Sequence, residues 1–296
     1  MKADIIWLGS VDSTNEEAKR RLSGIDNLSV LSAFEQKAGR GQQGNRWSSN
    51  PGENLTFSII LKFSGTASDS VTALPKLMAR DQFVLNEIAS LSVVEFLAGY
   101  GITARIKWPN DIYVEDRKIC GILVENSIRG DQISSSIIGI GLNINQKHFD
   151  VTLPNPTSMA LCHPHSICHP HSICHPEHSE GSFPLHPLLE EFTDIFISYH
   201  DRYLSAGNDT SALRRHYLER IWRKDQLSRF IDYTTEATGH NDGPMNIYRD
   251  SANNDKIPNE FRGMIRGLSG TGHLLVENLA TGTIRVFGFK EIGYIL

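Results

Sequence analysis

The hydrophobic pattern in the first two-thirds of the chain has two periods. Over residues 77–98, apolar residues recur at helical spacing, which predicts a long helix. Elsewhere, short apolar runs bounded by turn residues predict the strands of a mixed sheet, at residues 30–35, 54–63, 102–114, 119–128 and 133–145. We therefore expect an α/β (α+β) domain in which the long helix packs on the sheet.

Shorter segments predict further helices. Residues 186–205 place apolar side chains on one helical face, and another helix is expected at about 209–221. Near the start, Ser13 or Thr14 can cap a helix whose first turn carries the acidic residues Glu16 and Glu17. This helix should follow directly after an N-terminal strand.

The pattern changes again from Phe261, where short apolar strands alternate with glycine turns. Such spacing is typical of a small β-barrel, which we expect to start near Trp222. Residues 236–259 are polar and rich in glycine and asparagine, which predicts a loose loop inside this domain. The predicted domains are therefore residues 1–222 and 223–296.

Residues 162–181 contain a short repeat in which Cys-His-Pro-His-Ser-Ile occurs twice and a third copy begins at Cys174. Cysteine and histidine are good ligands for zinc or copper, so a metal site is one interpretation. The Cys-x₅-Cys spacing does not match the usual zinc pairing, and the prolines deny the segment a regular scaffold. We favour a low-complexity insertion. Cys120, which lies outside the repeat, is expected to be a buried strand residue.

Charge and hydropathy exclude some classes of partner. The net charge of −5 argues against broad nucleic-acid binding. The chain has no apolar run of about 18 residues or more and no signal peptide, so we expect a cytoplasmic protein without a membrane partner.

A glycine-rich loop at residues 39–49 carries the strongest chemical signal. Its glycines allow a backbone to approach a ligand closely, and Arg40 and Arg46 supply forked donors for phosphate or carboxylate. Trp47 adds a flat apolar face for a ring. The spacing matches neither a Walker loop nor a dinucleotide fingerprint, so we interpret the loop as a different kind of nucleotide contact or, less favourably, as a solvated glycine turn.

Six ordered motifs over about 130 residues resemble those of the biotin protein ligase family. The motifs are Asp12-Ser13-Thr14-Asn15, Gln36-Lys37-Ala38-Gly39-Arg40-Gly41, Trp47-Ser48, Lys107-Trp108-Pro109-Asn110-Asp111, Lys118-Ile119-Cys120-Gly121-Ile122-Leu123 and Gly139-Ile140-Gly141-Leu142-Asn143-Ile144-Asn145. The resemblance implies a mixed sheet with helices, like that of class II aminoacyl-tRNA synthetases, and a small C-terminal SH3-like β-barrel.

The resemblance also implies a two-step reaction. Biotin and Mg-ATP would give biotinyl-5′-AMP and pyrophosphate, and biotin would then pass to a lysine of a biotin carrier domain, by default that of acetyl-CoA carboxylase. The Mg²⁺ ion would be held mainly by ATP phosphates, so no protein metal site is expected. Two alternatives are a lipoate- or octanoyl-type ligase and a non-enzymatic biotin-binding module.

Individual site residues follow from the resemblance. Lys107 and Arg40 are the expected catalytic cations. The biotin carboxylate must approach the α-phosphate of ATP, and positive charges reduce the repulsion between these two anions. The implied biotin contacts are Ser13, Thr14, Asn15, Gln36, Gly39, Arg40, Gly41, Lys107 and Gly121. The implied ATP and adenylate contacts are Arg40, Gln42, Arg46, Trp47, Asn110 and Asn143. Asp111 is expected to brace its turn.

The chain departs from the family pattern at Gln42, where many members have a second arginine. We expect the reaction to persist and the retention of the intermediate to change. Some family members also carry an N-terminal DNA-binding domain, and because the motif at Ser13 comes so early we expect none here. Family members include monomers and homodimers, and both states stay open.

Overall fold

The computed structural model describes residues 3–63, 76–162, 182–204, 210–234 and 259–295. The chain divides into two compact units, Met1–Arg220 and Ile221–Leu296. The predicted low-complexity insertion at 162–181 lies outside the described residues except for Cys162, and the predicted loop at 236–259 does so except for Asn259.

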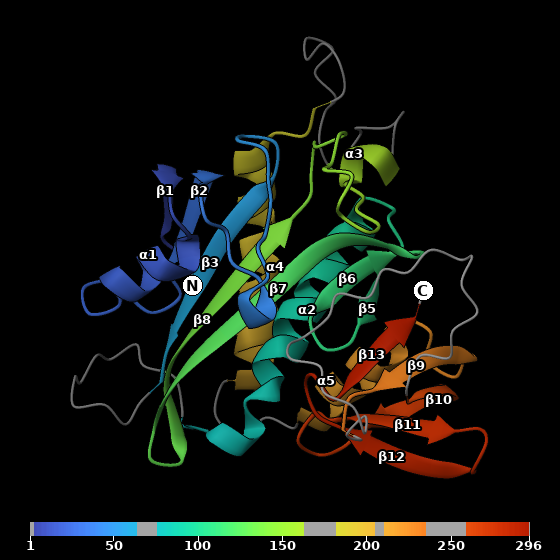
Figure 1. Cartoon of the computed structure of the whole chain (residues 1–296). Coiled ribbons are helices and arrows are strands. Elements are labelled where there is room, and N and C mark those ends of the chain that lie inside the picture. The colour runs from blue at the N-terminus through green and yellow to red at the C-terminus, as the bar shows by residue number, and fades with distance from the viewer. Residues whose placement is uncertain (1–2, 64–75, 163–181, 205–209, 235–258, 296) are drawn as a thin grey trace. The chain divides into compact units, whose positions relative to one another are not determined.

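The first unit is built on a mixed sheet, which has eight strands among the described residues (Figure 1). Strands β1 and β2 are parallel, and the other pairs are antiparallel. In spatial order the strands are β1 (Ile5–Val11), β2 (Val30–Gln36), β3 (Leu55–Lys62), β8 (Gln132–Leu142), β7 (Arg117–Arg129), β6 (Asp111–Val114) and β5 (Arg105–Lys107), with β4 (Leu77–Met78) paired to β8. The predicted mixed α/β fold is confirmed.

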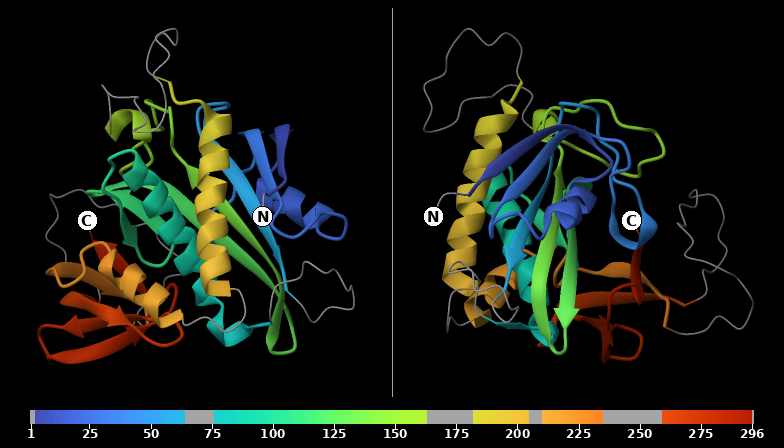
Figure 2. Two further views of the ribbon diagram at one scale, coloured as in Figure 1. Left: turned by 180° about the vertical axis from the view of Figure 1, so that it is seen from behind. Right: turned by 90° about the vertical axis from the view of Figure 1, so that its left-hand side faces the viewer.

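Helices cover both faces of this sheet (Figure 2). Helices α2 (Phe83–Gly99) and α4 (Leu185–Leu204) lie on one face, where Phe57 of β3 meets Phe192 of α4 edge-on at 5.1 Å between ring centroids. Helix α1 (Thr14–Arg21) lies on the other face, where Ala18 packs in the same buried cluster as Ile60. Because strand side chains alternate, Ser58 shares this second face with Ile60.

Helix α2 is almost entirely buried, although Ala79–Gly99 is long and apolar enough to span a membrane by length and composition. Of its most apolar window, 78% is buried inside the protein, as in a core helix. The helix begins later than predicted, because Leu77 and Met78 pair with β8 as a short strand and Ala79–Asp81 forms the 3₁₀ turn η2. The remaining helices of this unit are η1 (Gln42–Gly44), α3 (Met159–Cys162) and α5 (Thr210–Glu219).

Helix α5 fixes the segment that joins β5 to β6. The predicted strand at 102–114 is broken at a cis Trp108–Pro109 peptide bond, as expected for a residue that cannot donate to a ladder. The Tyr217 hydroxyl of α5 donates to the Pro109 carbonyl at 3.1 Å. The Ile106 amide of β5 donates to the backbone carbonyl of Arg220, just after α5, at 2.8 Å. These bonds hold in place the turn that carries Asn110.

The second unit is a five-stranded antiparallel sheet. Its spatial order is β12 (Thr283–Phe287), β11 (Leu274–Asn278), β10 (Glu260–Leu268), β9 (Ser228–Asp232) and β13 (Ile292–Ile295). Phe230, Ile265, Val276 and Phe287 are fully buried in it. A C-terminal β-sheet unit is therefore confirmed. Its SH3-like class stays a prediction, and strand β9 was not predicted.

Candidate active site

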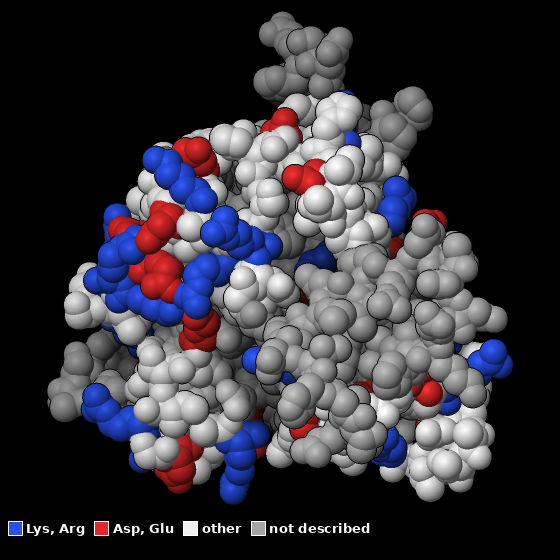
Figure 3. Space-filling view, in the orientation of Figure 1, with Lys and Arg blue, Asp and Glu red and all other residues white. Residues whose placement is uncertain are grey.

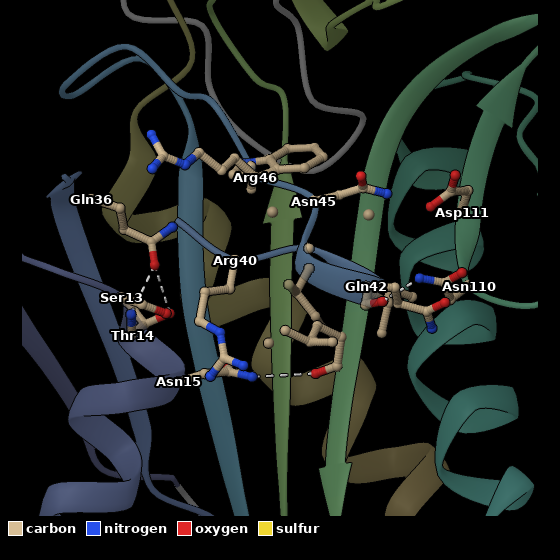
Figure 4. Close-up of a pocket in the computed structure, with 18 of the residues that line it drawn as sticks. Ser13, Thr14, Asn15, Gln36, Arg40, Gln42, Asn45, Arg46, Asn110 and Asp111 are labelled. Carbon is tan, nitrogen blue, oxygen red and sulfur yellow. Dashed lines mark hydrogen bonds between the residues drawn. The ribbon is translucent and has the colours of Figure 1, made fainter. Parts of the chain in front are cut away.

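A cavity of about 220 Å³ opens over strands β7 and β8 of the first unit (Figure 4). Its lining comes from the start of α1 with the end of β2, from the glycine-rich loop, and from the β5–β6 turn with the adjoining strands. The lining residues used below are Ser13, Thr14, Asn15, Gln36, Arg40, Gly41, Gln42, Arg46, Trp47, Asn110, Asp111, Lys118, Gly121, Gly139 and Gly141.

Two paired glycines form the floor of the cavity beneath Trp47. Gly121 of β7 lies opposite Gly141 of β8 in the sheet register. A Cβ atom at Gly141 would lie 2.7 Å from Cζ2 of the Trp47 indole, and one at Gly121 would lie 3.0 Å from Cζ3. The indole can therefore lie against the sheet only because both positions lack a side chain. Its Nε1 is buried, with no hydrogen-bond partner among the described residues.

One end of the cavity is a buried network of neutral groups. The Thr14 amide and hydroxyl donate to Oε1 of Gln36, at 2.8 and 3.2 Å. Ser58 Oγ lies 2.8 Å from the Thr14 hydroxyl and donates to Asn15 Oδ1 at 2.6 Å. A Cβ at Gly139 would lie 2.9 Å from the Asn15 Cγ, so this glycine makes room for the amide. The polar groups at this end are thus fixed by one another.

Ser13 and Thr14 do not act as the helix cap that the sequence suggested. Ser13 occupies the N-cap position in extended conformation, but its side chain makes no cap hydrogen bond. Thr14 is the first helical residue, and its hydroxyl bonds to Gln36. Both residues line the cavity.

The glycine-rich loop folds back over the cavity. Arg40 and Arg46 form an isolated antiparallel bridge, the Gly41 amide donates to the Asn45 carbonyl at 2.7 Å, and Gly44 closes the turn at a φ of +83°. Only glycine adopts that backbone conformation without strain. Figure 4 shows the two arginine side chains leaving this bridge in different directions, Arg40 toward Asn15 and Arg46 away from it.

Lys118, rather than Lys107, supplies the lysine of the cavity. The Lys118 ammonium lies 2.7 Å from Asp111 Oδ1 and 5.7 Å from the centroid of the Trp47 ring. Lys107 does not line the cavity, and its ammonium donates to the Tyr113 hydroxyl at 2.9 Å. The sequence analysis quoted Lys118 within a motif but did not assign it to the site.

The remaining predicted site residues divide into two groups. Asn110 lines the cavity and donates from its amide to the Ile122 carbonyl at 2.5 Å. Asn143 is not part of the lining. Its side-chain amide donates to the Thr157 carbonyl at 2.9 Å, and its Oδ1 is buried without a partner among the described residues. Gly39 lines a neighbouring cavity together with Arg40.

The residues that the structure describes include no group of three or more histidine, cysteine, aspartate or glutamate side chains suited to a metal ion. The carboxylate in the cavity lining, Asp111, is paired with Lys118. Cys120 is fully buried, as predicted, and burial raises the pKa of its thiol far above the usual range. The cavity therefore offers cations, amides and hydroxyls.

Known proteins match this part of the chain. Residues 7–143 match the model of the biotin/lipoate A/B protein ligase family. The bifunctional ligase/repressor BirA of Bacillus spizizenii is 35% identical over 152 residues, which are 51% of this chain and 43% of that protein. The biotin–[acetyl-CoA-carboxylase] ligase of Paracoccus denitrificans is 34% identical over 140 residues, 46% of this chain and 53% of that protein. The chain thus spans about half the length of these relatives.

A solved structure extends the likeness to the whole fold. The biotin protein ligase of Aquifex aeolicus, determined in complex with biotin and ATP, superposes with a TM-score of 0.67 at 20% identity, covering 99% of this chain and 98% of that one. At this identity the match shows a shared fold. Together with the sequence matches, it confirms the resemblance to biotin protein ligases.

Proposed function

We propose that this chain is a biotin protein ligase, which makes biotinyl-5′-AMP and pyrophosphate from biotin and Mg-ATP and then biotinylates a carrier lysine. The observation that carries the proposal is a cavity that has a neutral network at one end, Lys118 beside Asp111 at the other, and Arg40 reaching toward Asn15. Arg40 and Lys118 are here called the charged groups of the cavity. The names of the relatives support the proposal, since they are those of biotin ligases.

The neutral end suits the ureido ring of biotin. That ring carries N–H donors and a carbonyl acceptor but no charge, so it is recognised by hydroxyl and amide groups. Ser13, Thr14 and Asn15 supply such groups from buried positions, and Gln36 supplies them from a partly buried one.

The charged groups suit adenylate formation. The biotin carboxylate attacks the α-phosphorus of ATP, a P–O bond forms, and pyrophosphate leaves with the electrons of the bond that breaks. Lys118 and Arg40 reduce the repulsion between the two anions and stabilise the charge at phosphorus. We assign to Lys118 the role that the sequence analysis gave to Lys107. Arg46, Gln42 and Asn110 also line the cavity, and we assign them to the nucleotide.

Transfer needs positioning more than further chemistry. The carrier lysine attacks the carbonyl carbon of the mixed anhydride, an amide bond forms, and AMP leaves. Holding the anhydride beside the amine turns this into an effectively unimolecular step, without a covalent enzyme intermediate. The Mg²⁺ ion would be carried by ATP phosphates, and we propose a biotin carrier domain of acetyl-CoA carboxylase or another carboxylase as partner.

The test is biotin transfer to a purified apo carrier domain with Mg-ATP, read with labelled streptavidin. The full-length chain should label the carrier, Lys118→Ala should not, and Lys107→Ala should label it measurably. Parallel reactions with lipoate and octanoate distinguish the alternative ligase. Acylation by either of these, with none by biotin, would contradict the proposal, and so would biotin binding without pyrophosphate release.

A further inference from the structure

Arg40 is held by two carboxylates at the edge of the cavity. Its guanidinium is ion-paired with Glu16 of α1, and its Nη1 lies 3.4 Å from Glu125 Oε1 of β7. Lys19 joins the same pair of carboxylates, at 2.9 Å from Glu16 and 3.0 Å from Glu125. These four residues, here called the Arg40 cluster, contain two positive and two negative charges and are neutral as a whole.

The Arg40 cluster also reaches the neutral end of the cavity. Glu125 uses Oε1 for Lys19 and Arg40, while its Oε2 accepts a hydrogen bond of 2.8 Å from the Asn15 amide. One carboxylate thus holds both one of the charged groups and an amide of the neutral end. Figure 4 shows the Arg40 guanidinium extending down beside Asn15.

If Arg40 moves to a ligand anion, the charges that remain in the Arg40 cluster are no longer balanced. Two carboxylates then keep one cation, Lys19, which bridges both. Hydrogen bonding from Lys19 already lowers the pKa of Glu16, so that carboxylate stays charged at neutral pH. Lys19 therefore limits the cost of releasing Arg40, while Glu16 and Glu125 compete with the ligand for it.

We propose that Glu16 and Glu125 hold the Arg40 guanidinium in ion pairs until an anionic ligand in the cavity displaces them, with Lys19 setting how readily they release it. The inference rests on the proposed function in that the ligand is the adenylate or its phosphate precursor. Glu16, Glu125 and Lys19 are then positioning residues that act through Arg40. Their competition adjusts how long the activated intermediate is retained.

The first experiment needs no substrate. In the ligand-free protein, trypsin cleavage after Arg40 is compared with cleavage after Arg46, which lies in the same loop. Glu16→Gln should raise the Arg40-to-Arg46 ratio about two- to fivefold, the range of one partly exposed ion pair. Lys19→Gln should lower it. Glu17→Gln is the matched control, because Glu17 pairs instead with Arg20 and Arg21 on the same helix.

The second experiment measures dissociation of biotinyl-AMP in a double-mutant cycle. Glu16→Gln should slow dissociation about two- to fivefold in the parent and have no effect in an Arg40→Gln background. Equal effects in both backgrounds would show a long-range charge effect and overturn the proposal. Faster dissociation in Glu16→Gln would also overturn it, because the carboxylates would then orient Arg40 for the ligand.

The two readouts separate this inference from the proposed function. A chain that makes no biotinyl-AMP would still show the change in trypsin cleavage if the Arg40 cluster holds the loop. Unchanged cleavage ratios in both Glu16→Gln and Lys19→Gln would refute the cluster, whatever reaction the chain performs.

Discussion

The neutral groups and the charged groups of the cavity are held in opposite ways. At the neutral end, Thr14, Asn15 and Ser58 are at most 3% exposed and bond to one another. The charged groups are Arg40, which reaches toward Asn15, and Lys118, which lies beside Asp111; their side chains are 44% and 32% exposed and are paired with carboxylates. Figure 3 shows the same interleaving of acidic and basic side chains over the surface around α1.

The difference separates recognition from reaction. A buried neutral network exists before the ligand arrives, so binding costs little reorganisation and rejects ligands without matching groups. Exposed cations that already have partners respond instead to a competing anion. We therefore expect changes at the neutral end to alter biotin affinity, and changes at the charged groups to alter the rate of adenylation.

Removing the cavity lysine should have the largest effect. Lys118→Ala should slow pyrophosphate release about 10²- to 10³-fold, as losing a charge-stabilising donor does in other enzymes. Lys107→Ala is the control, and a loss there as large as that of Lys118→Ala would put the reacting anions near Tyr113 and break the comparison.

Filling the glycine floor should have the next largest effect. In Gly141→Ala the new methyl would overlap the Trp47 indole, and overpacking of this kind costs about 1–3 kcal/mol. Biotin should bind about ten- to a hundredfold more weakly in calorimetry. Gly9→Ala is the matched control, because a Cβ at that strand glycine meets nothing within 4 Å. Equal binding by Gly141→Ala would show that the indole does not rest on the floor when biotin is bound.

Cutting the neutral network should weaken biotin binding without slowing chemistry. Thr14→Val keeps the shape of the side chain and the backbone bond to Gln36 but removes the hydroxyl beside Ser58. An unsatisfied buried group costs about 1–3 kcal/mol, so KM for biotin should rise about tenfold with kcat little changed. A parallel fall in kcat would mean that this end also positions the carboxylate.

The smallest effect is expected at Gln42. Gln42→Arg adds a cation to the loop edge of the cavity, where an exposed charge contributes about 0.2–1 kcal/mol. Dissociation of biotinyl-AMP should slow about two- to fivefold, and adenylation should persist. Identical dissociation rates for the variant and the parent would rule out a role for this position in retention.

Much of the fold could be predicted because its strands and helices carry simple periods. The strand at 54–63 and the helix at 186–205 correspond to β3 (Leu55–Lys62) and α4 (Leu185–Leu204). The predicted start of the long helix was wrong because Leu77 and Met78 pair with the first residues of β8, next to the stretch that pairs with β3. This is a tertiary effect that local pattern does not encode.

The catalytic role of Lys107 stays a prediction, whereas Lys118 is a residue of the cavity that sequence reasoning did not assign. Lys118 lies three residues before Gly121, so strict alternation would put the two on opposite faces of β7. The register with β6 shifts between Ile112 and Tyr113, and this irregularity brings Lys118 Cε within 3.4 Å of where a Gly121 Cβ would lie. The sequence motif contained the lysine, but only the pairing of strands shows which way it points.

The central claim is that the neutral groups bind biotin and the charged groups promote adenylation. Biotin binding by Lys118→Ala in the absence of ATP tests this claim most directly. Calorimetry should give a Kd within about tenfold of the parent, because one partly exposed ion pair contributes at most about 1 kcal/mol, while the same sample should release almost no pyrophosphate when Mg-ATP is added. Loss of biotin binding altogether would show that the charged groups also recognise biotin, and would contradict the account.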